Sequence, residues 1–312
     1  MTNRSATSDN HSQSKSLGSP AFSLEAAEKW ALERSQNLPD ELFRLTAIWY
    51  INFVRQPVPG ERKTRYIAKL AQAQNYGIAM GLSPNLPEPN ADLVGEDARQ
   101  VLKNGMWGDE IERTALVDLV ISYVSRPADQ QIRLEGSPHA KYSARSTIFA
   151  DEVASVFQTR GSKYLKGNKP RVLVIGATAG IIRGLLNRGF DVSATDLASE
   201  IIGHKLGGVK IQGGEDANER FIAEADIAVV TGMTLPNGSL PIIVEQAAKC
   251  NTSILIWAIT GRNFGDYYTQ YGVDTVISDP SPFLHLPGAA TIAIWRKKTG
   301  VVSGSSIVTP PR

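Results

Sequence analysis

The feature that most constrains the fold is the alternation of short aliphatic runs with helical segments in the second half of the chain. Runs rich in β-branched and aliphatic residues predict strands at 171–175, 192–195, 209–212, 227–230, 254–259, 275–278 and 290–295. Helical segments fit between the first five runs and before the sixth. Continuous apolar runs such as Val172–Ile175 are typical of strands buried on both faces of a parallel sheet. The pattern therefore predicts an α/β fold with a doubly wound sheet.

The link before the last predicted strand differs from the others because it is rich in proline. Pro280, Pro282 and Pro287 leave no room for a crossover helix, and parallel crossovers usually need a dozen or more residues. The last strand is therefore expected to pair antiparallel with its predecessor. Six parallel strands with an antiparallel seventh resemble the Rossmann-like fold of the class I S-adenosylmethionine-dependent methyltransferases. The resemblance implies that residues 166–298 bind S-adenosylmethionine, as cofactor or as substrate.

The first half of the chain has helical spacing instead. Residues 21–165 are predicted to form a helical domain that acts as a lid, with Ser23 as the first N-cap. Helices are expected near 24–37, 39–56, 62–80, 91–103, 109–125 and 143–160, with a loop at 127–138. The polar tails at 1–20 and 299–312 have little to bury and are predicted to be disordered.

Composition and charge narrow the classes of function. The formal net charge of +2 gives no broad field to attract nucleic acid or an anionic membrane. No apolar run approaches the roughly 20 residues that span a bilayer. Cys250 is the single cysteine, and the histidines lack the paired spacing of metal ligands: His11, His139, His204 and His285. We therefore expect a cytoplasmic protein with a small-molecule substrate and no metal, nucleic-acid or membrane site; a homodimer is left open.

A loop of small residues follows the first predicted strand and precedes a helix. It consists of Gly176, Ala177, Thr178, Ala179 and Gly180. Such a turn lets a ligand approach the backbone closely. The dinucleotide fingerprint G-x-G-x-x-G would need glycine where Thr178 and Ile181 stand. The methyltransferase pattern of alternate glycines keeps Gly176 and Gly180, so the resemblance implies a contact with S-adenosylmethionine here. The alternative is a βα turn that uses glycine only for packing.

Acidic residues follow the second and third predicted strands. Asp196 lies about 20 residues after Gly176, where a carboxylate accepts hydrogen bonds from ribose hydroxyls in dinucleotide-binding folds. Leu197 is next to it in the same predicted contact. For Asp216, the methyltransferase resemblance implies a contact with the adenine amine. Each aspartate has an alternative interpretation as a helix N-cap.

The segment after the fourth predicted strand carries a motif. Residues 231–240 read Thr-Gly-Met-Thr-Leu-Pro-Asn-Gly-Ser-Leu. This is similar to the Thr-Gly-x-Thr-Leu-x-Asn-Gly-Thr-Leu signature of a Rossmann-like family described as putative heavy-metal chelation proteins. Its place at the carboxyl edge of the sheet predicts cofactor contacts from Thr231, Gly232, Met233, Thr234 and Asn237. The alternative is a tight turn at 237–238 with Ser239 as the N-cap.

Several reactions remain open. The Asp/Asn-Pro-Pro-aromatic motif of amino-directed methyltransferases is missing after the fourth strand. A helical region followed by a Rossmann-like domain resembles the layout of azetidine-2-carboxylate synthases. That resemblance implies cyclisation of S-adenosylmethionine to azetidine-2-carboxylate and methylthioadenosine. Alternatives are a small-molecule methyltransferase, a non-catalytic metal- or ligand-binding protein, and a nicotinamide oxidoreductase.

Three residues are candidates for the cyclisation chemistry. Tyr142 is expected to cover the sulfonium or accept from the amine, and Arg145 is expected to hold the carboxylate. Asn237 is expected to face the methionine part of the cofactor. The alternative is that Tyr142 packs in the core and Arg145 lies on a solvated helix face.

Overall fold

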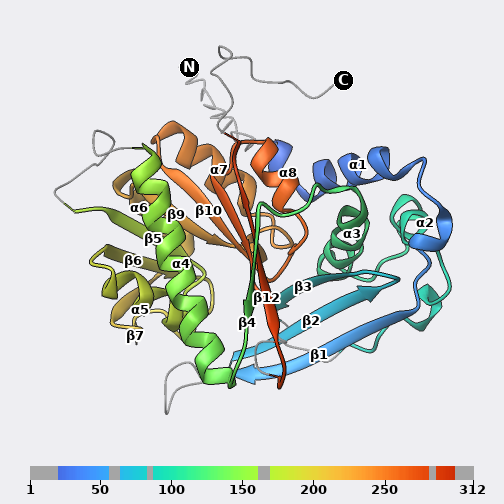
Figure 1. The fold of residues 1–312 in the computed structure, drawn as a ribbon, viewed down its shortest axis with the longest axis horizontal. Coiled ribbons are helices and arrows are strands. Elements are labelled where there is room, and N and C mark those ends of the chain that lie inside the picture. The colour runs from blue at the N-terminus through green and yellow to red at the C-terminus, as the bar shows by residue number, and fades with distance from the viewer. Residues whose placement is uncertain (1–19, 56–63, 83–86, 161–168, 281–285, 299–312) are drawn as a thin grey trace, which may run out of the picture.

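The computed structural model describes residues 20–55, 64–82, 87–160, 169–280 and 286–298. These residues form one sheet of nine strands and one of three, with helices packed around both (Figure 1). The large sheet is mostly parallel with antiparallel strands at its two ends. The fold is therefore of the mixed α/β type.

The nine-stranded sheet contains every strand predicted in the second half of the chain. Six strands are parallel neighbours in the order β8-β6-β5-β9-β10-β11, and β12 pairs antiparallel with β11, as predicted. Their bounds are β5 (Arg171–Ile175), β6 (Asp191–Asp196), β8 (Val209–Gly213), β9 (Ile227–Thr231), β10 (Ser253–Ala258), β11 (Thr275–Ser278) and β12 (Ala290–Arg296). Two further strands were not predicted: β4 (Gln130–Leu134) beside β12, and β7 (Lys205–Leu206) beside β8.

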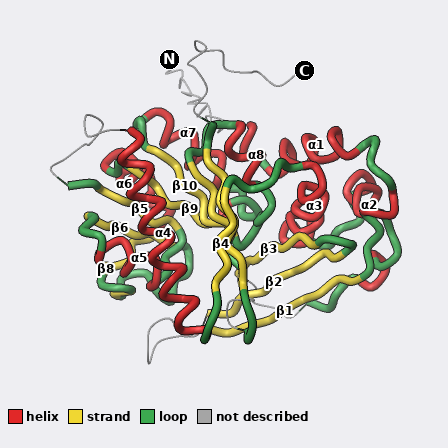
Figure 2. The backbone as a smooth tube through the Cα atoms, in the orientation of Figure 1, coloured by secondary structure: helices red, strands yellow, loops and turns green. Residues whose placement is uncertain are grey.

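Helices cover both faces of the large sheet (Figure 2). Side chains of α4 (Pro138–Arg160) and α5 (Ala179–Asn187) share one core with Val172 and Val174 of β5. Side chains of α6 (Gly214–Glu224), α7 (Leu240–Lys249) and α8 (Gly265–Gln270) share the other core with Leu173 and Ile175. Alternate residues of one apolar run thus face two cores, which is why the run is continuous.

The prediction of a purely helical first half is wrong. Residues expected to be helical at 39–56 and 62–80 instead form most of an antiparallel three-stranded sheet of β1 (Ala47–Arg55), β2 (Thr64–Gln72) and β3 (Tyr76–Leu82). β1 is rich in β-branched and aromatic residues, which fit a pleated surface. Each strand pairs antiparallel with its neighbour in the chain, so helical spacing was a misleading signal.

Three helices belong with this sheet: α1 (Leu24–Ser35), α2 (Ala98–Asn104) and α3 (Glu110–Val124). Helix α3 packs on β2 and β3, and α1 and α2 contact α3 (Figure 1). The predicted N-cap is confirmed, because Ser23 Oγ accepts the N–H of Ala26 at 3.2 Å. Helix α4 starts before its predicted start and so contains Tyr142. The predicted loop at 127–138 contains β4, which pairs with β12 of the large sheet. Helix α4 packs on the same sheet. The predicted domain boundary near 165 is therefore not seen in the structure, because these two elements precede it and still belong to the large sheet. The predicted tails lie outside the described residues, except Pro20.

Hydrogen bonds tie the small sheet to the large one. Thr260 Oγ1, after β10, accepts the N–H of Met80 at 2.8 Å, and the N–H of Gly261 donates to the carbonyl of Ile78 at 3.0 Å. Asp118 on α3 accepts the N–H groups of Ile78 at 2.9 Å and Asn263 at 2.8 Å. β3 is therefore fixed against the loop that follows β10. None of the described helices has the length and apolar character that crossing a membrane requires.

Candidate functional site

A pocket of about 630 Å³ lies where the carboxyl ends of the parallel strands meet the small sheet. We call it the edge pocket. Its floor and one side come from the ends of β5, β6, β9 and β10 and the loops that follow them. The opposite wall comes from the first half of the chain: Tyr66, Met80, Gly81, Leu82 and Ile111. Its size falls in the range of pockets that bind small molecules, roughly 300–1,000 Å³.

The loop after β5 lines the edge pocket with Gly176, Ala177 and Thr178. Gly176 has φ +86°, and a Cβ there would lie 2.4 Å from Thr231 Cγ2, so conformation and packing both require glycine. Gly180 is not among the lining residues. A Cβ on Gly180 would lie 3.0 Å from Ser146 Oγ on α4, so this glycine serves helix packing. The loop thus lines the edge pocket at Gly176 and packs against α4 at Gly180.

Asp196 reaches the edge pocket from the end of β6. Its Oδ2 accepts the N–H of Ala177 at 2.7 Å and its Oδ1 accepts the N–H of Ala198 at 2.8 Å. The carboxylate therefore joins the loops after β5 and β6. Burial raises the pKa of Asp196, against the opposing effect of backbone N–H bonds. Leu197 is 48% exposed at the pocket, whereas the side chain of Asp216, in α6, lies outside the described residues.

The segment after β9 forms a tight turn and also lines the edge pocket. Thr231, Met233, Thr234 and Asn237 are lining residues, and Thr234 Oγ1 donates to the carbonyl of Thr231 at 2.7 Å. Asn237 Oδ1 accepts the N–H and the hydroxyl of Ser239 at 3.1 and 2.7 Å, which makes the predicted tight turn. Gly232 is not in the lining, because its Cα packs against the carbonyl of Thr260.

Two of the predicted catalytic residues lie away from the pocket lining. Arg145 is 2% exposed, and its Nε lies 2.6 Å from Oδ2 of Asp279. Tyr142 is half-buried and packs against the core beside α4, with the Arg145 guanidinium 5.6 Å from its ring centre. The pattern of the sequence gave no sign of Asp279 as a partner, since the two residues are far apart in the chain.

The charges of the edge pocket have one sign. Its lining includes the carboxylates of Asp196 and Glu219 and the aromatic rings of Tyr66 and Trp257, and no Lys, Arg or His among the described residues. Sequence reasoning missed both aromatic residues. Trp257 could have been found as a large side chain near the end of the fifth predicted strand, but Tyr66 was hidden by the incorrect helix at 62–80. The pocket therefore suits a neutral or cationic ligand.

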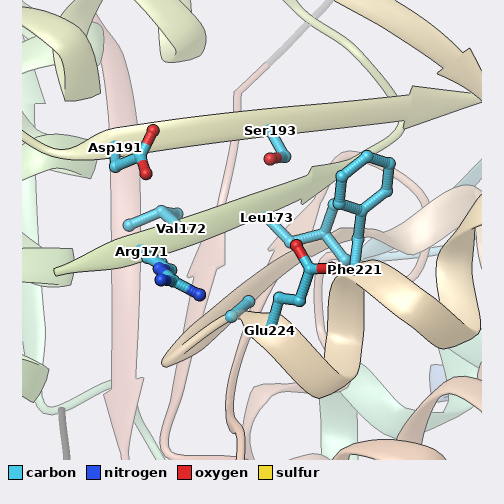
Figure 3. A pocket seen from close by; sticks show the side chains of 8 residues that line it. Arg171, Val172, Leu173, Asp191, Ser193, Phe221 and Glu224 are labelled. Atoms are coloured by element: carbon cyan, nitrogen blue, oxygen red, sulfur yellow. The ribbon is translucent and has the colours of Figure 1, made fainter. Parts of the chain in front are cut away.

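A smaller depression of about 270 Å³ lies along β5 and β6 nearer their amino ends (Figure 3). Arg171 and Asp191 begin these strands, and Glu224 of α6 lies opposite them. None of the described residues that were predicted to contact a cofactor lines it. The predicted cofactor-contact residues that lie together therefore do so in the edge pocket, at the carboxyl ends of the strands.

The fold and site define a mixed α/β protein with a pocket at the carboxyl edge of its large sheet. Residues 164–276 match the model of the DUF364 family, described as "Putative heavy-metal chelation". No curated protein matches the chain. In the described part of the chain, no group of three or more His, Cys, Asp or Glu side chains is placed to hold a metal ion.

Two solved structures of DUF364 proteins of unknown function are similar to this chain. The protein from Pyrococcus horikoshii is 12% identical, covers 88% of this chain and 99% of its own, and has a TM-score of 0.46. The protein from Desulfitobacterium hafniense is 14% identical, covers 86% of this chain and 98% of its own, and has a TM-score of 0.47.

Proposed function

We propose that the protein is an enzyme that binds S-adenosylmethionine in the edge pocket, as cofactor or as substrate. The observation that carries the proposal is the character of the lining, which combines carboxylates with aromatic rings and lacks a cationic side chain among the described residues. A sulfonium is attracted to aromatic faces by roughly 0.5–2 kcal/mol. The pyrophosphate of a nicotinamide dinucleotide would find no cationic side chain in this lining, which favours the sulfonium compound.

The proposal includes the interpretation of the large sheet as a doubly wound Rossmann-like unit. The order β8-β6-β5-β9-β10-β11 places the third, second and first parallel strands before the fourth, fifth and sixth. The order of the strands reverses between the parallel neighbours β5 and β9, and open α/β sheets bind ligands at such a switch point. Gly176, directly after β5, packs there against Thr231, the last residue of β9.

The residues of the edge pocket fit the parts of such a ligand. Asp196 already accepts the backbone N–H groups of Ala177, Ala198 and Leu197, and a carboxylate has about four acceptor sites, which leaves one for a ribose hydroxyl. Tyr66 and Trp257 supply aromatic faces for the sulfonium. Thr231 and Asn237 supply hydroxyl and amide groups for the methionine end.

We favour cyclisation of S-adenosylmethionine over methyl transfer, because no usual acceptor motif follows β9. In cyclisation the neutral amine nitrogen bonds to Cγ, the Cγ–sulfur bond breaks, and methylthioadenosine leaves with the electron pair. Glu219, at the pocket, is a candidate for taking the amine proton. Holding nitrogen, Cγ and sulfur in line can contribute roughly 7–11 kcal/mol. Tyr142 and Arg145 do not contact the substrate in this proposal.

Incubating the purified protein with S-adenosylmethionine alone tests the reaction. Methylthioadenosine and azetidine-2-carboxylate in the mass spectrum would support cyclisation, whereas turnover only after a nucleophile is added would support methyl transfer. Absence of S-adenosylmethionine binding by calorimetry would overturn the proposal. If zinc or nickel then gave heat of binding, the non-catalytic metal-binding alternative would replace it.

Replacing Asp196 with alanine is expected to weaken S-adenosylmethionine binding by about 1.5–3 kcal/mol, since a hydrogen bond to a charged group is lost. The free N–H groups of Ala177 and Ala198 add to the loss. Calorimetric Kd values for Asp196→Ala and wild type give the difference. The control is Asp191→Ala, which removes an exposed carboxylate at the other end of β6 and should leave Kd unchanged. Equal Kd values for folded Asp196→Ala and wild type would contradict the assignment.

A further inference from the structure

A buried ion pair adjoins the aromatic side of the edge pocket. Arg145 Nε on α4 lies 2.6 Å from Asp279 Oδ2, and the side chains are 3% and 0% exposed. The same Oδ2 accepts the indole N–H of Trp257 at 2.8 Å. Trp257 lines the pocket from β10, whereas Arg145 and Asp279 do not. A single carboxylate oxygen therefore connects α4 to the pocket wall.

The pair is placed to orient the indole ring. Asp279 holds its N–H, and the guanidinium carbon of Arg145 lies 5.1 Å from its ring centre. Phe149, also on α4, contacts the ring edge-to-face with centres 6.2 Å apart. Because desolvation offsets much of the attraction in a buried ion pair, such a pair adds little net stability. Its effect on Trp257 is therefore the more informative property.

The pair also sets the charge close to the ring. A guanidinium 5.1 Å from the indole centre opposes a second cation on the same ring, and the adjacent carboxylate cancels that repulsion. Burial lowers the pKa of Arg262, and the negative charge of Asp279 partly offsets this lowering. Asp279 is thus an anion close to both the buried Arg145 and the partly buried Arg262. Without it, the pocket side at Trp257 would be electropositive.

We infer that Trp257 is the residue that contacts the sulfonium, and that Arg145 and Asp279 are positioning residues that fix the indole and neutralise its surroundings. The pocket would then distinguish S-adenosylmethionine from S-adenosylhomocysteine, its neutral thioether, by charge. This inference rests on the proposed function. It adds Trp257 as the residue that recognises the sulfonium charge, and the ion pair of Arg145 and Asp279 as the groups that hold Trp257 in place.

The test is the ratio of Kd values for S-adenosylhomocysteine and S-adenosylmethionine, measured by calorimetry on the full chain. Trp257→Leu removes the aromatic face and is expected to lower this ratio by about 2- to 30-fold, whereas Trp257→Phe keeps a face and most of the preference. Asp279→Asn keeps an acceptor for the indole N–H but removes the charge, so the ratio should fall. Arg145→Gln removes the opposing cation, so the ratio should rise. A purely structural role would change both Kd values together.

The outcomes separate the two proposals. If wild type binds neither compound, the proposed function fails and the inference fails with it. If wild type binds S-adenosylmethionine but folded Trp257→Leu and Asp279→Asn keep the wild-type ratio, the inference is overturned and the proposed function stands. If Asp279→Asn does not fold, circular dichroism will show it, and the Trp257→Leu and Trp257→Phe variants decide alone because they leave the ion pair intact.

Discussion

Replacing Gly176 with alanine is expected to abolish ligand binding and to lower the free energy of unfolding by about 2–5 kcal/mol. Two effects add. At φ +86° a Cβ is strained by roughly 1–2 kcal/mol, and overpacking against Thr231 Cγ2 at 2.4 Å adds typically 1–3 kcal/mol. The loop must move to relieve the contact, which displaces Ala177 and Thr178 from the pocket lining. Urea unfolding and calorimetry measure the two losses.

Gly189 offers a matched control for this substitution. Its φ is +85°, and a Cβ there would have no neighbour within 4 Å. Gly189→Ala should therefore carry only the conformational strain, about 1–2 kcal/mol, and bind the ligand normally. Equal losses of stability in the two variants would show that the contact with Thr231 has no weight.

Replacing Asp118 with alanine is expected to destabilise the protein by about 2–6 kcal/mol. Asp118 is fully buried, and its oxygens accept the N–H groups of Ile78 and Asn263. Each buried donor left without a partner costs roughly 1–3 kcal/mol. Because these donors belong to β3 and to the loop after β10, the loss should also loosen the wall of the edge pocket. Urea unfolding monitored by circular dichroism gives the difference.

Asp118 also predicts how stability depends on pH. Burial raises the pKa of this carboxyl to about 8, outweighing the N–H bonds that lower it, while an unfolded aspartate titrates near pH 3.9. Between about pH 4 and 8 the folded state holds one more proton than the unfolded state. The stability that this group contributes is therefore fully present below about pH 4, falls progressively as pH rises, and is lost once the pH passes about 8. In Asp118→Asn this part of the pH dependence should disappear. An identical pH profile in the variant and wild type would refute the assignment.

The sequence was most informative where a strand is buried on both faces. Runs such as Val172–Ile175 alternate between two cores in the structure, so each remains apolar throughout and its ends are marked by polar residues. The proline-rich link correctly predicted the direction of β12. Both signals are local in the sequence. The short apolar run favours a buried strand, and the prolines exclude a crossover helix before β12.

The small sheet could not be predicted in the same way. β2 and β3 carry apolar residues at spacings that a helix also satisfies, although the two strands pair with each other across a short turn. β3 is buried on both faces because α3 packs on it so closely that a Cβ at Gly77 would lie 2.1 Å from the carbonyl of Ala115. Only tertiary contact decides such a segment.

The sequence predicted the side of the candidate site that is made by the βα loops of the large sheet. It did not predict the side that is made by the first half of the chain. Gly176, Asp196 and Thr231 were identified because the carboxyl ends of parallel strands meet at one edge. Tyr66 of β2 and Ile111 of α3 also line the pocket because the small sheet and its helix pack against the large sheet. No spacing in the sequence indicates this packing. Arg145 was expected to hold a substrate carboxylate, and the structure gives it a carboxylate of the chain instead.

The hydrogen bonds from Thr260 and Gly261 to β3 have a kinetic consequence. Since wall and floor are bonded together, the two halves of the pocket cannot swing apart without breaking these bonds. Exchange of a ligand is left to rotamer changes of the exposed lining residues Leu82, Leu197 and Ile242, which take picoseconds to nanoseconds. Stopped-flow association rates should then rise linearly with ligand concentration and show no plateau from a slow opening step.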